Sequence, residues 1–501
     1  MFNLIHVCHG WSLRFGRRNH PVQAAVPTKL CTNIVGLIMI SGWLSACSLI
    51  SPIPKHNEAD LESHYILIHE EGYPVSIQHG VLWDSRKAMD TVEFNKRIDK
   101  ILAQIETTTA KAVAEQEPLR LLFFVHGGLN TYRADFKRML ELLDKNSGLF
   151  AKTTYHPIFI NWNSSLWDSV IDDIFLVRLG KRREILGPLT APFMLAGRLA
   201  STAIGAPGAW LNSLDNFMEG IQSADSEGDE PAHAAGLTFL GIAVAPIRAI
   251  TIPIVEAFGG GAWHIMRRRV ELAVASRLLH RHVDYTDEGA ARTLFLRLEE
   301  KVREAKISNP GLRIEVTLVG HSMGAMLLNR LLTLVTDLPI KRVVYLAAAS
   351  RLDDFEHYVI PFGAKRETEI RWFSLARADE AAESHYLISP SGSLLVWIDN
   401  YFEPIAANGQ TTFGRFRNLS EYYTGWLTPP EEDGLIKFSQ DAGERFQRIQ
   451  GYKASMKNAK RPKEHGDFDK PYVFQTILCQ LDRRAFIDQK DCTPTPTMFS
   501  R

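Results

Sequence analysis

The segment TLVGHSMGAML (residues 317–327) constrains the fold more than any other part of the sequence. A serine stands between two glycines there, after a β-rich run and before an apolar, helix-like run. A strand that turns directly into a helix around Gly-x-Ser-x-Gly strains the serine backbone and presents its hydroxyl as a nucleophile. A side chain at Gly320 or Gly324 would collide with the neighbouring strand or helix. The pattern predicts a nucleophile elbow at Ser322; the alternative is an ordinary Gly/Ser turn.

Strands and helices alternate on both sides of this segment. The continuous apolar run of residues 119–130 predicts a strand buried on both faces, and residues 156–162 predict a second one. A helical pattern, YRADFKRMLELLDK, lies between them, which makes a βαβ unit. The alternation resumes with EGAARTLFLRLEEKVREAK (helix), LRIEVTLVG (strand), AMLLNRLLTLVTD (helix), KRVVYLAAAS (strand) and EIRWFSLAR (strand). We therefore expect an α/β fold with a mostly parallel sheet flanked by helices.

With the elbow in this context, residues 119–474 resemble the α/β-hydrolase superfamily, in particular its lipases and esterases. The resemblance implies the order nucleophile, acid, base, with the acid after the strand EIRWFSLAR. Asp379 is the first carboxylate after that strand and is the predicted acid, ahead of Glu380 and Glu383. Asp353 and Asp354 are the alternatives, because some lipases carry the acid one strand earlier.

The base should follow the last strand of such a fold. His357 and His385 both come too early, whereas His465 lies in the late polar loop KEHGDFDKP. His465 is therefore the predicted base, and GLIKFSQ is the best candidate for the strand before it. The resemblance also implies an oxyanion hole formed by the N–H of Met323 and by that of Gly128 or Leu129. His126 is expected to be a structural residue of the same loop.

Composition excludes some other classes of protein. The 501 residues contain 57 basic and 57 acidic side chains, so no net field attracts nucleic acid. No cysteine and histidine set has the spacing of zinc ligands, and no phosphate-binding loop occurs. We therefore expect no metal, no cofactor and no nucleic-acid partner.

The N-terminal residues resemble the signal of a bacterial lipoprotein. Four basic residues precede the apolar run Ile34–Leu44, which is too short to span a bilayer, and the run ends in Leu-Ser-Ala-Cys47. The resemblance implies a signal at residues 1–47, lipid on Cys47 and, because Ser48 follows, sorting to the outer membrane facing the periplasm. Residues 48–60 then form a tether.

Removal of this signal leaves Cys479 and Cys492 as the remaining cysteines besides the lipidated one. In an oxidising periplasm they can pair, closing a short loop worth about 3 kcal/mol in the chain-entropy model. Two unpaired thiols are the alternative.

An insertion at residues 167–283 interrupts the predicted core of residues 61–166 and 284–501. It contains two apolar stretches, residues 189–211 and 236–255, that are broken by prolines and arginines and edged by basic residues. Such stretches do not suit spanning helices, but they suit a helical cap or lid that lies in a lipid interface. A cap that packs its apolar faces on the core is the alternative.

Two classes of function follow. The first is a membrane-tethered serine hydrolase that cleaves carboxylic esters, lipid acyl esters included, through Ser322, Asp379 and His465; an acyltransferase would use the same triad. The second is a binding or scaffold lipoprotein that keeps the fold without catalysis. The sequence names no substrate.

Overall fold

A computed structural model describes most of the chain beyond its N-terminal residues. The described residues are 61–78, 85–127, 132–144, 148–198, 255–276, 288–383, 392–403, 412–418, 449–454, 460–492 and 498–500, with residues 200, 208, 210 and 252. Residues 1–54 with 77–85 form one compact unit, and residues 55–76 with 86–501 form the other. The first unit contributes to the description only the ends of β2 (Val75–Gln78) and β3 (Ser85–Ala88).

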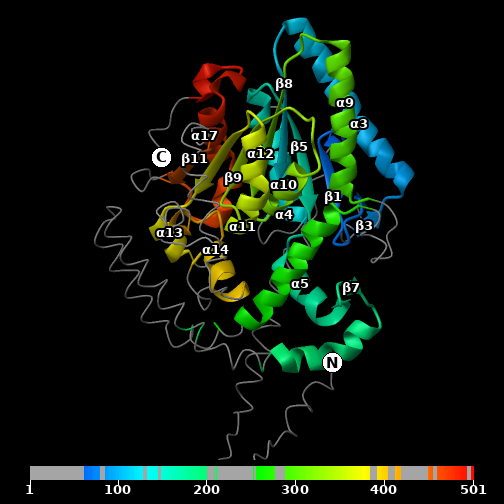
Figure 1. The fold of residues 1–501 in the computed structure, drawn as a ribbon, viewed down its shortest axis with the longest axis vertical. Coiled ribbons are helices and arrows are strands. Elements are labelled where there is room, and N and C mark those ends of the chain that lie inside the picture. Colours follow the sequence, from blue (N-terminus) through cyan, green and yellow to red (C-terminus); the bar gives the residue numbers. More distant parts are fainter. Residues whose placement is uncertain are drawn as a thin grey trace, which may run out of the picture. The chain divides into compact units, whose positions relative to one another are not determined.

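An eight-stranded sheet forms the centre of the second unit (Figure 1). Its strands, in spatial order, are β1 (Tyr65–Ile68), β5 (Tyr155–Trp162), β4 (Leu119–Val125), β8 (Ile314–His321), β9 (Ile340–Leu346), β10 (Glu369–Ser374), β11 (Ile449–Ala454) and β12 (Phe499–Ser500). Every neighbouring pair is parallel except β11 and β12. The predicted α/β class with a mostly parallel sheet is confirmed.

The central strands are buried over nearly their whole length because helices cover both of their faces. All seven residues of β4 are buried. Successive side chains of a strand point to opposite faces, and the ring of Phe123 contacts Phe295 of α9 (Ala290–Ser308), whereas Phe124 contacts Phe474 of α17 (Pro471–Leu481). Helix α3 (Thr91–Glu115) lies beside α9 (Figure 1).

Further α-helices of the described residues connect or flank the strands. They are α4 (Tyr132–Leu143), α5 (Leu166–Ile171), α10 (Gly324–Leu332), α11 (Leu352–Asp354), α12 (Ile360–Lys365), α13 (Arg377–Ala382) and α14 (Leu394–Trp397). Turns of 3-10 helix cover Phe150–Lys152, His465–Asp469, Arg483–Ala485 and Gln489–Cys492, and π-helical turns cover Asp172–Leu176, Phe355–Val359 and Ile398–Phe402.

The described part of the insertion is helical apart from one small hairpin. Strands β6 (Val177–Arg178) and β7 (Lys181–Arg182) pair antiparallel, and residues 186–198 and 255–273 are helical. Most of the two apolar stretches lies outside the described residues. Within the described part of the chain, no helix has both the length and the apolar character needed to cross a membrane.

Candidate active site

Ser322 occupies the turn between β8 and α10, at the carboxyl edge of the sheet. Its φ is +52°, a left-handed conformation that a non-glycine residue adopts only at an energetic cost. The side chain is buried, and its hydroxyl has no hydrogen-bond partner among the residues that the structure describes. A strained serine with an uncommitted hydroxyl is the geometry that the sequence pattern predicts for a nucleophile elbow.

Close backbone contacts explain the glycines around Ser322. A Cβ added to Gly324 would lie 2.0 Å from the carbonyl oxygen of Val125, at the end of β4, and one added to Gly320 would lie 2.9 Å from Ala325 Cα. A Cβ at Gly127 would lie 2.4 Å from the backbone nitrogen of Met323. The elbow and the loop after β4 can therefore approach each other only because neither carries a side chain at these points.

The end of the neighbouring strand β9 holds the elbow through its backbone. Ser322 N–H donates to the carbonyl of Leu346 at 2.9 Å, and the N–H of Ala349 donates to the carbonyl of Ser322 at 2.9 Å. Ala347 between them has a φ of +41°. Gly414 packs on this strained loop, since a Cβ there would lie 2.2 Å from the backbone nitrogen of Ala348. No sequence pattern indicates this contact of residues 412–418 with the loop.

His465 begins a 3-10 turn that packs against the elbow. The carbonyl oxygen of His465 lies 3.0 Å from Nε2 of His321, the residue before the serine, and the two rings are 5.3 Å apart. A carbonyl can only accept, so Nε2 of His321 carries the proton. Burial lowers the pKa of His321, which favours the neutral ring. The structure thus brings His465 beside the residue that adjoins Ser322.

Two carboxylates of the segment after β10 contact the loop that carries His465. Asp379, in the first turn of α13, pairs with the guanidinium of Arg461 through both oxygens, at 2.6 and 3.0 Å. Glu383, just after α13, accepts the backbone N–H of His465 at 2.9 Å. Burial raises the pKa of Glu383 from 4.5 to about 8, although the N–H of His465 opposes the shift. Glu380 instead pairs with Arg415.

The alternative acids lie on α11, after β9. Asp353 pairs with Arg351 at 2.8 Å and is partly exposed. Burial, followed by the nearby charge of Asp353, raises the pKa of Asp354, while Arg330 and Arg267 oppose the shift. Asp353 is therefore engaged by the arginine that precedes α11, and Asp354 lies in the field of arginines of α10 and of the insertion.

Part of the predicted oxyanion hole lies outside the described residues. The Met323 backbone begins α10 next to Gly127, as the close contact above shows, but Gly128 and Leu129 are not described. His126 is fixed from two sides: its Nε2 accepts the N–H of Trp162 at 3.0 Å and lies 2.9 Å from Asp135, and its carbonyl accepts the indole N–H of Trp162 at 2.8 Å. Burial raises the pKa of Asp135. These contacts fix the start of the loop.

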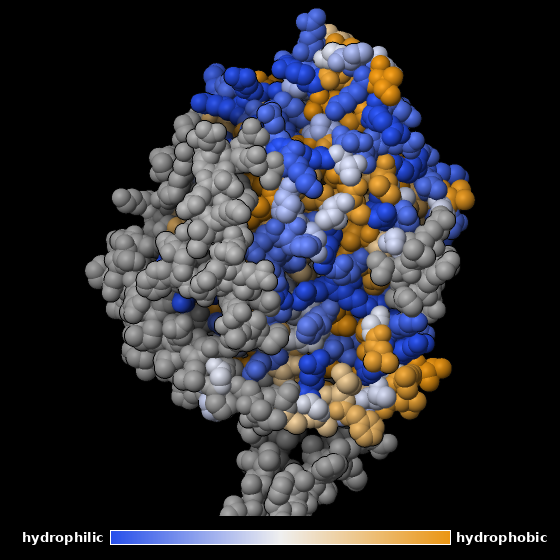
Figure 2. Space-filling view, in the orientation of Figure 1, coloured by the Kyte–Doolittle hydropathy of each residue, from blue (hydrophilic) through white to orange (hydrophobic). Residues whose placement is uncertain are grey.

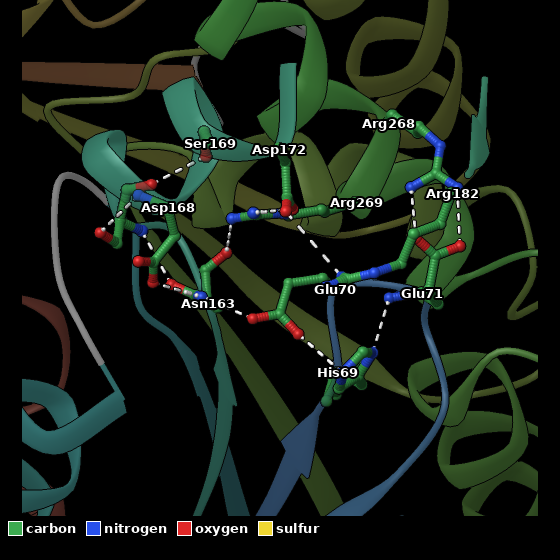
Figure 3. Close-up of polar contacts among 12 residues, drawn as sticks. His69, Glu70, Glu71, Asn163, Asp168, Ser169, Asp172, Arg182, Arg268 and Arg269 are labelled. Atoms are coloured by element: carbon green, nitrogen blue, oxygen red, sulfur yellow. Dashed lines mark hydrogen bonds and ion pairs between the residues drawn. The ribbon is translucent and has the colours of Figure 1, made fainter. Parts of the chain in front are cut away.

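A polar network joins the carboxyl ends of β1 and β5 to the insertion (Figure 3). Asn163 donates through Nδ2 to Glu70 at 2.7 Å and to Asp168 at 2.8 Å. Arg269, on the insertion helix of residues 255–273, donates to the carbonyl of Asn163 at 2.9 Å and to Asp172 at 2.7 Å. The network therefore attaches the described part of the insertion to the same sheet edge that carries the elbow.

The remaining predicted site residues are three cysteines. Cys47 lies outside the described residues. Cys479, on α17, and Cys492 are joined by a disulfide, with a Cα–Cα distance of 5.4 Å. Over the ranges that the structure describes, no group of His, Cys, Asp and Glu side chains has the arrangement of a metal site.

Comparison with known proteins finds no relative that could carry a function to this chain. No protein-family model, no curated protein and no solved structure matches it. The function of the chain is therefore inferred from the geometry of the site.

Proposed function

We propose that the chain is a serine hydrolase of α/β-hydrolase fold that cleaves carboxylic esters through an acyl-enzyme on Ser322. One observation carries the proposal: a strained serine at a strand-to-helix turn adjoins His321, and His321 bonds the loop that presents His465. The parallel sheet, with helices on both faces and the serine at its carboxyl edge, supports the same assignment.

The proposed mechanism follows the logic of a serine, a base and an acid. His465 takes the proton of the Ser322 hydroxyl as its oxygen attacks the ester carbonyl, and then gives that proton to the leaving alcohol. The same imidazole then deprotonates a water molecule, which attacks the acyl-enzyme. The carboxylic acid product leaves, and the serine hydroxyl regains its proton. The Met323 N–H and a donor of the loop after Gly127 stabilise the oxyanion. Asp379 is the proposed acid, and Glu383 is the alternative that its bond to His465 supports.

A fluorophosphonate probe tests the nucleophile directly, because it labels only an activated serine. The native chain should be labelled on Ser322, whereas Ser322→Ala and His465→Ala should lose labelling and lose several orders of magnitude of ester hydrolysis, about 10³-fold or more. Ser350→Ala is the matched control: Ser350 is also buried, in the loop after β9, but its φ is not positive. It should be labelled at the native rate.

The possible results separate the classes of function. A folded native chain that is never labelled would favour the binding or scaffold protein. Normal hydrolysis by His465→Ala would remove the base assignment. Labelling together with transfer of the acyl group to an added alcohol, in preference to water, would identify an acyltransferase.

We further propose that lipid on Cys47 tethers the enzyme to the outer membrane, facing the periplasm. Mass spectrometry of the mature N-terminus should find a lipid-modified Cys47, and Cys47→Ser should leave the signal uncleaved. A mature, unlipidated chain that begins at another residue would contradict this part of the proposal without affecting the catalytic part.

A further inference from the structure

One side of the insertion exposes an apolar surface that the fold does not bury. We call it the insertion face and define it by five residues: Leu179, Ile185, Leu186, Leu189 and Phe193. Leu189 is 69% exposed, Phe193 79% and Ile185 80%. Figure 2 shows apolar surface gathered at the lower right of the view, over the region where Figure 1 places β7. Side chains of this size are rarely exposed side by side without a partner.

The helical spacing shows that the exposure is organised. Leu189 and Phe193 stand four positions apart in the helix of residues 186–198 and therefore share one side of it. Ile185 lies in the turn just before that helix, four positions before Leu189. Gly187 and Ala191, which lie on the opposite side, are buried. This helix therefore turns its largest apolar side chains away from the protein.

Arg178 holds this arrangement in place. Its guanidinium donates to the carbonyls of Asp173 at 2.8 Å and Gly187 at 2.9 Å, and its Nε donates to Thr190 at 2.6 Å. One arginine therefore ties the hairpin, the π-helical turn before it and the helix after it together. Arg198 adds an ion pair to Asp173 at 3.0 Å.

The hairpin is also fixed to the body of the protein. Arg268, on the insertion helix, donates through Nε to the carbonyl of Gly180, at the hairpin turn, at 2.8 Å. The same guanidinium pairs with both oxygens of Glu71, beyond β1, at 3.0 and 2.6 Å (Figure 3). Among the described residues, the insertion face is therefore held in place by polar contacts with the body of the protein.

Basic residues border the face. Lys181, Arg182 and Arg183 lie between Leu179 and Ile185, with Glu184 as the one acidic residue of that segment. Apolar side chains edged by cations fit the boundary between acyl chains and anionic headgroups. A fluid bilayer surface also needs no complementary shape in the protein that docks on it.

We propose that the insertion face docks on an anionic lipid bilayer. The length of the tether favours this occupant, because residues 48–60 reach at most about 45 Å when fully extended from a lipidated Cys47. A body held so close to the bilayer meets lipid at a high effective concentration, so weak contacts suffice. The inference shares the lipid on Cys47 with the proposed function but does not rest on catalysis.

A thiol-reactive fluorophore at single added cysteines tests the docking. Leu189→Cys and Phe193→Cys probe the face, and Ile307→Cys is the matched control, because Ile307 is an equally exposed apolar residue (73%) at the end of α9. The full chain is reconstituted through its own anchor into vesicles of phosphatidylethanolamine and phosphatidylglycerol. The parent chain, labelled in the same way, supplies the background.

Two quenchers distinguish the occupants of the face. We expect nitroxide-labelled lipid to quench the dye at Leu189→Cys and Phe193→Cys and aqueous iodide to quench it at Ile307→Cys. The nitroxide effect should be smaller in vesicles of zwitterionic phosphatidylcholine, which carry no net charge. Quenching by iodide at all three positions would overturn the proposal. Protection from both quenchers at the face would mean that protein covers it, either residues 199–251 or a second copy, and would also overturn it. An unchanged melting temperature in each variant confirms that the fold is intact.

Discussion

Gly324→Ala is the substitution whose effect can be worked out most fully from the geometry of the elbow. The new Cβ would lie 2.0 Å from the carbonyl oxygen of Val125. Non-bonded carbon and oxygen atoms settle at about 3.2 Å or more, so the start of α10 or the end of β4 must move by about 1 Å. Neither can yield by rotating a side chain, because the colliding atom belongs to the backbone of a central strand.

Two opposing terms set the loss of stability. Overpacking of this kind costs about 1–3 kcal/mol. Alanine at a helical position recovers up to about 1 kcal/mol relative to glycine, through helix propensity and through a less flexible unfolded chain. We therefore expect a net loss of about 0–3 kcal/mol and a chain that still folds.

The catalytic loss should be larger than the loss of stability. A displacement of about 1 Å moves Ser322 relative to the loop after β4, and misplacement on this scale costs about 100-fold in rate. The assay is kcat/KM for a short soluble ester, measured with a thermal melt. Gly466→Ala is the control, because Gly466 adjoins His465 but has open space around its Cβ position. Native kcat/KM in Gly324→Ala, or an equal loss in Gly466→Ala, would refute the steric reasoning.

Two further predictions concern stability. Replacing both Cys479 and Cys492 by serine should lower the free energy of unfolding by about 3 kcal/mol, and a chain whose melting temperature is unchanged would mean that the closed loop contributes nothing. The second concerns Glu383: because its pKa is about 8 in the folded chain and 4.5 as an unperturbed group, the folded chain keeps a proton that the unfolded chain releases. Stability is therefore lost as the pH rises from about 4.5 to 8. Glu383→Gln should melt at a higher temperature than the native chain at pH 8 and at nearly the same temperature near pH 4.5; a lower melting temperature at pH 8 would contradict the shift.

The parts of the fold that the sequence predicts are those that depend on local patterns. Strands β4 and β10 lie within the apolar runs that predict them, and β5, β8 and β9 extend one residue beyond theirs. Helix α4 lies within its expected segment, and α9 continues two residues past the end of its own. Burial on both faces requires an apolar residue at nearly every position, so such strands are visible without knowledge of their partners.

Other elements carry too little local pattern to be predicted. Strand β1 has four residues, and its place beside β5 depends on a pairing over about 90 residues of chain. The strands β6 and β7 have two residues each, which is too short for an alternating pattern. The strand before His465 in the described chain is β11, and the segment GLIKFSQ, which the sequence favours for that role, lies outside the described residues.

The same distinction applies to the site. Ser322 is predictable because the steric demand of the elbow is local, so glycines must stand two residues to either side of the serine. The partner of Asp379 could not be predicted, because Arg461 is 82 residues away and no motif marks it. The contact of residues 412–418 with the loop after β9 could not be predicted either, since it depends on a single glycine, Gly414.

The choice between Asp379 and Glu383 shows what the contacts add to the spacing. The two carboxylates stand four residues apart, at the start and just beyond the end of α13, and both follow the same strand, so order along the chain favours neither strongly. In the folded chain both contact the loop of His465, one through Arg461 and the other through the N–H of His465 itself. A carboxylate held by a guanidinium stays ionised, as an acid that stabilises an imidazolium must. Glu383, whose burial favours its protonated form, is less suited to that task at neutral pH. We therefore propose Asp379 as the acid, with Glu383 fixing the backbone of His465.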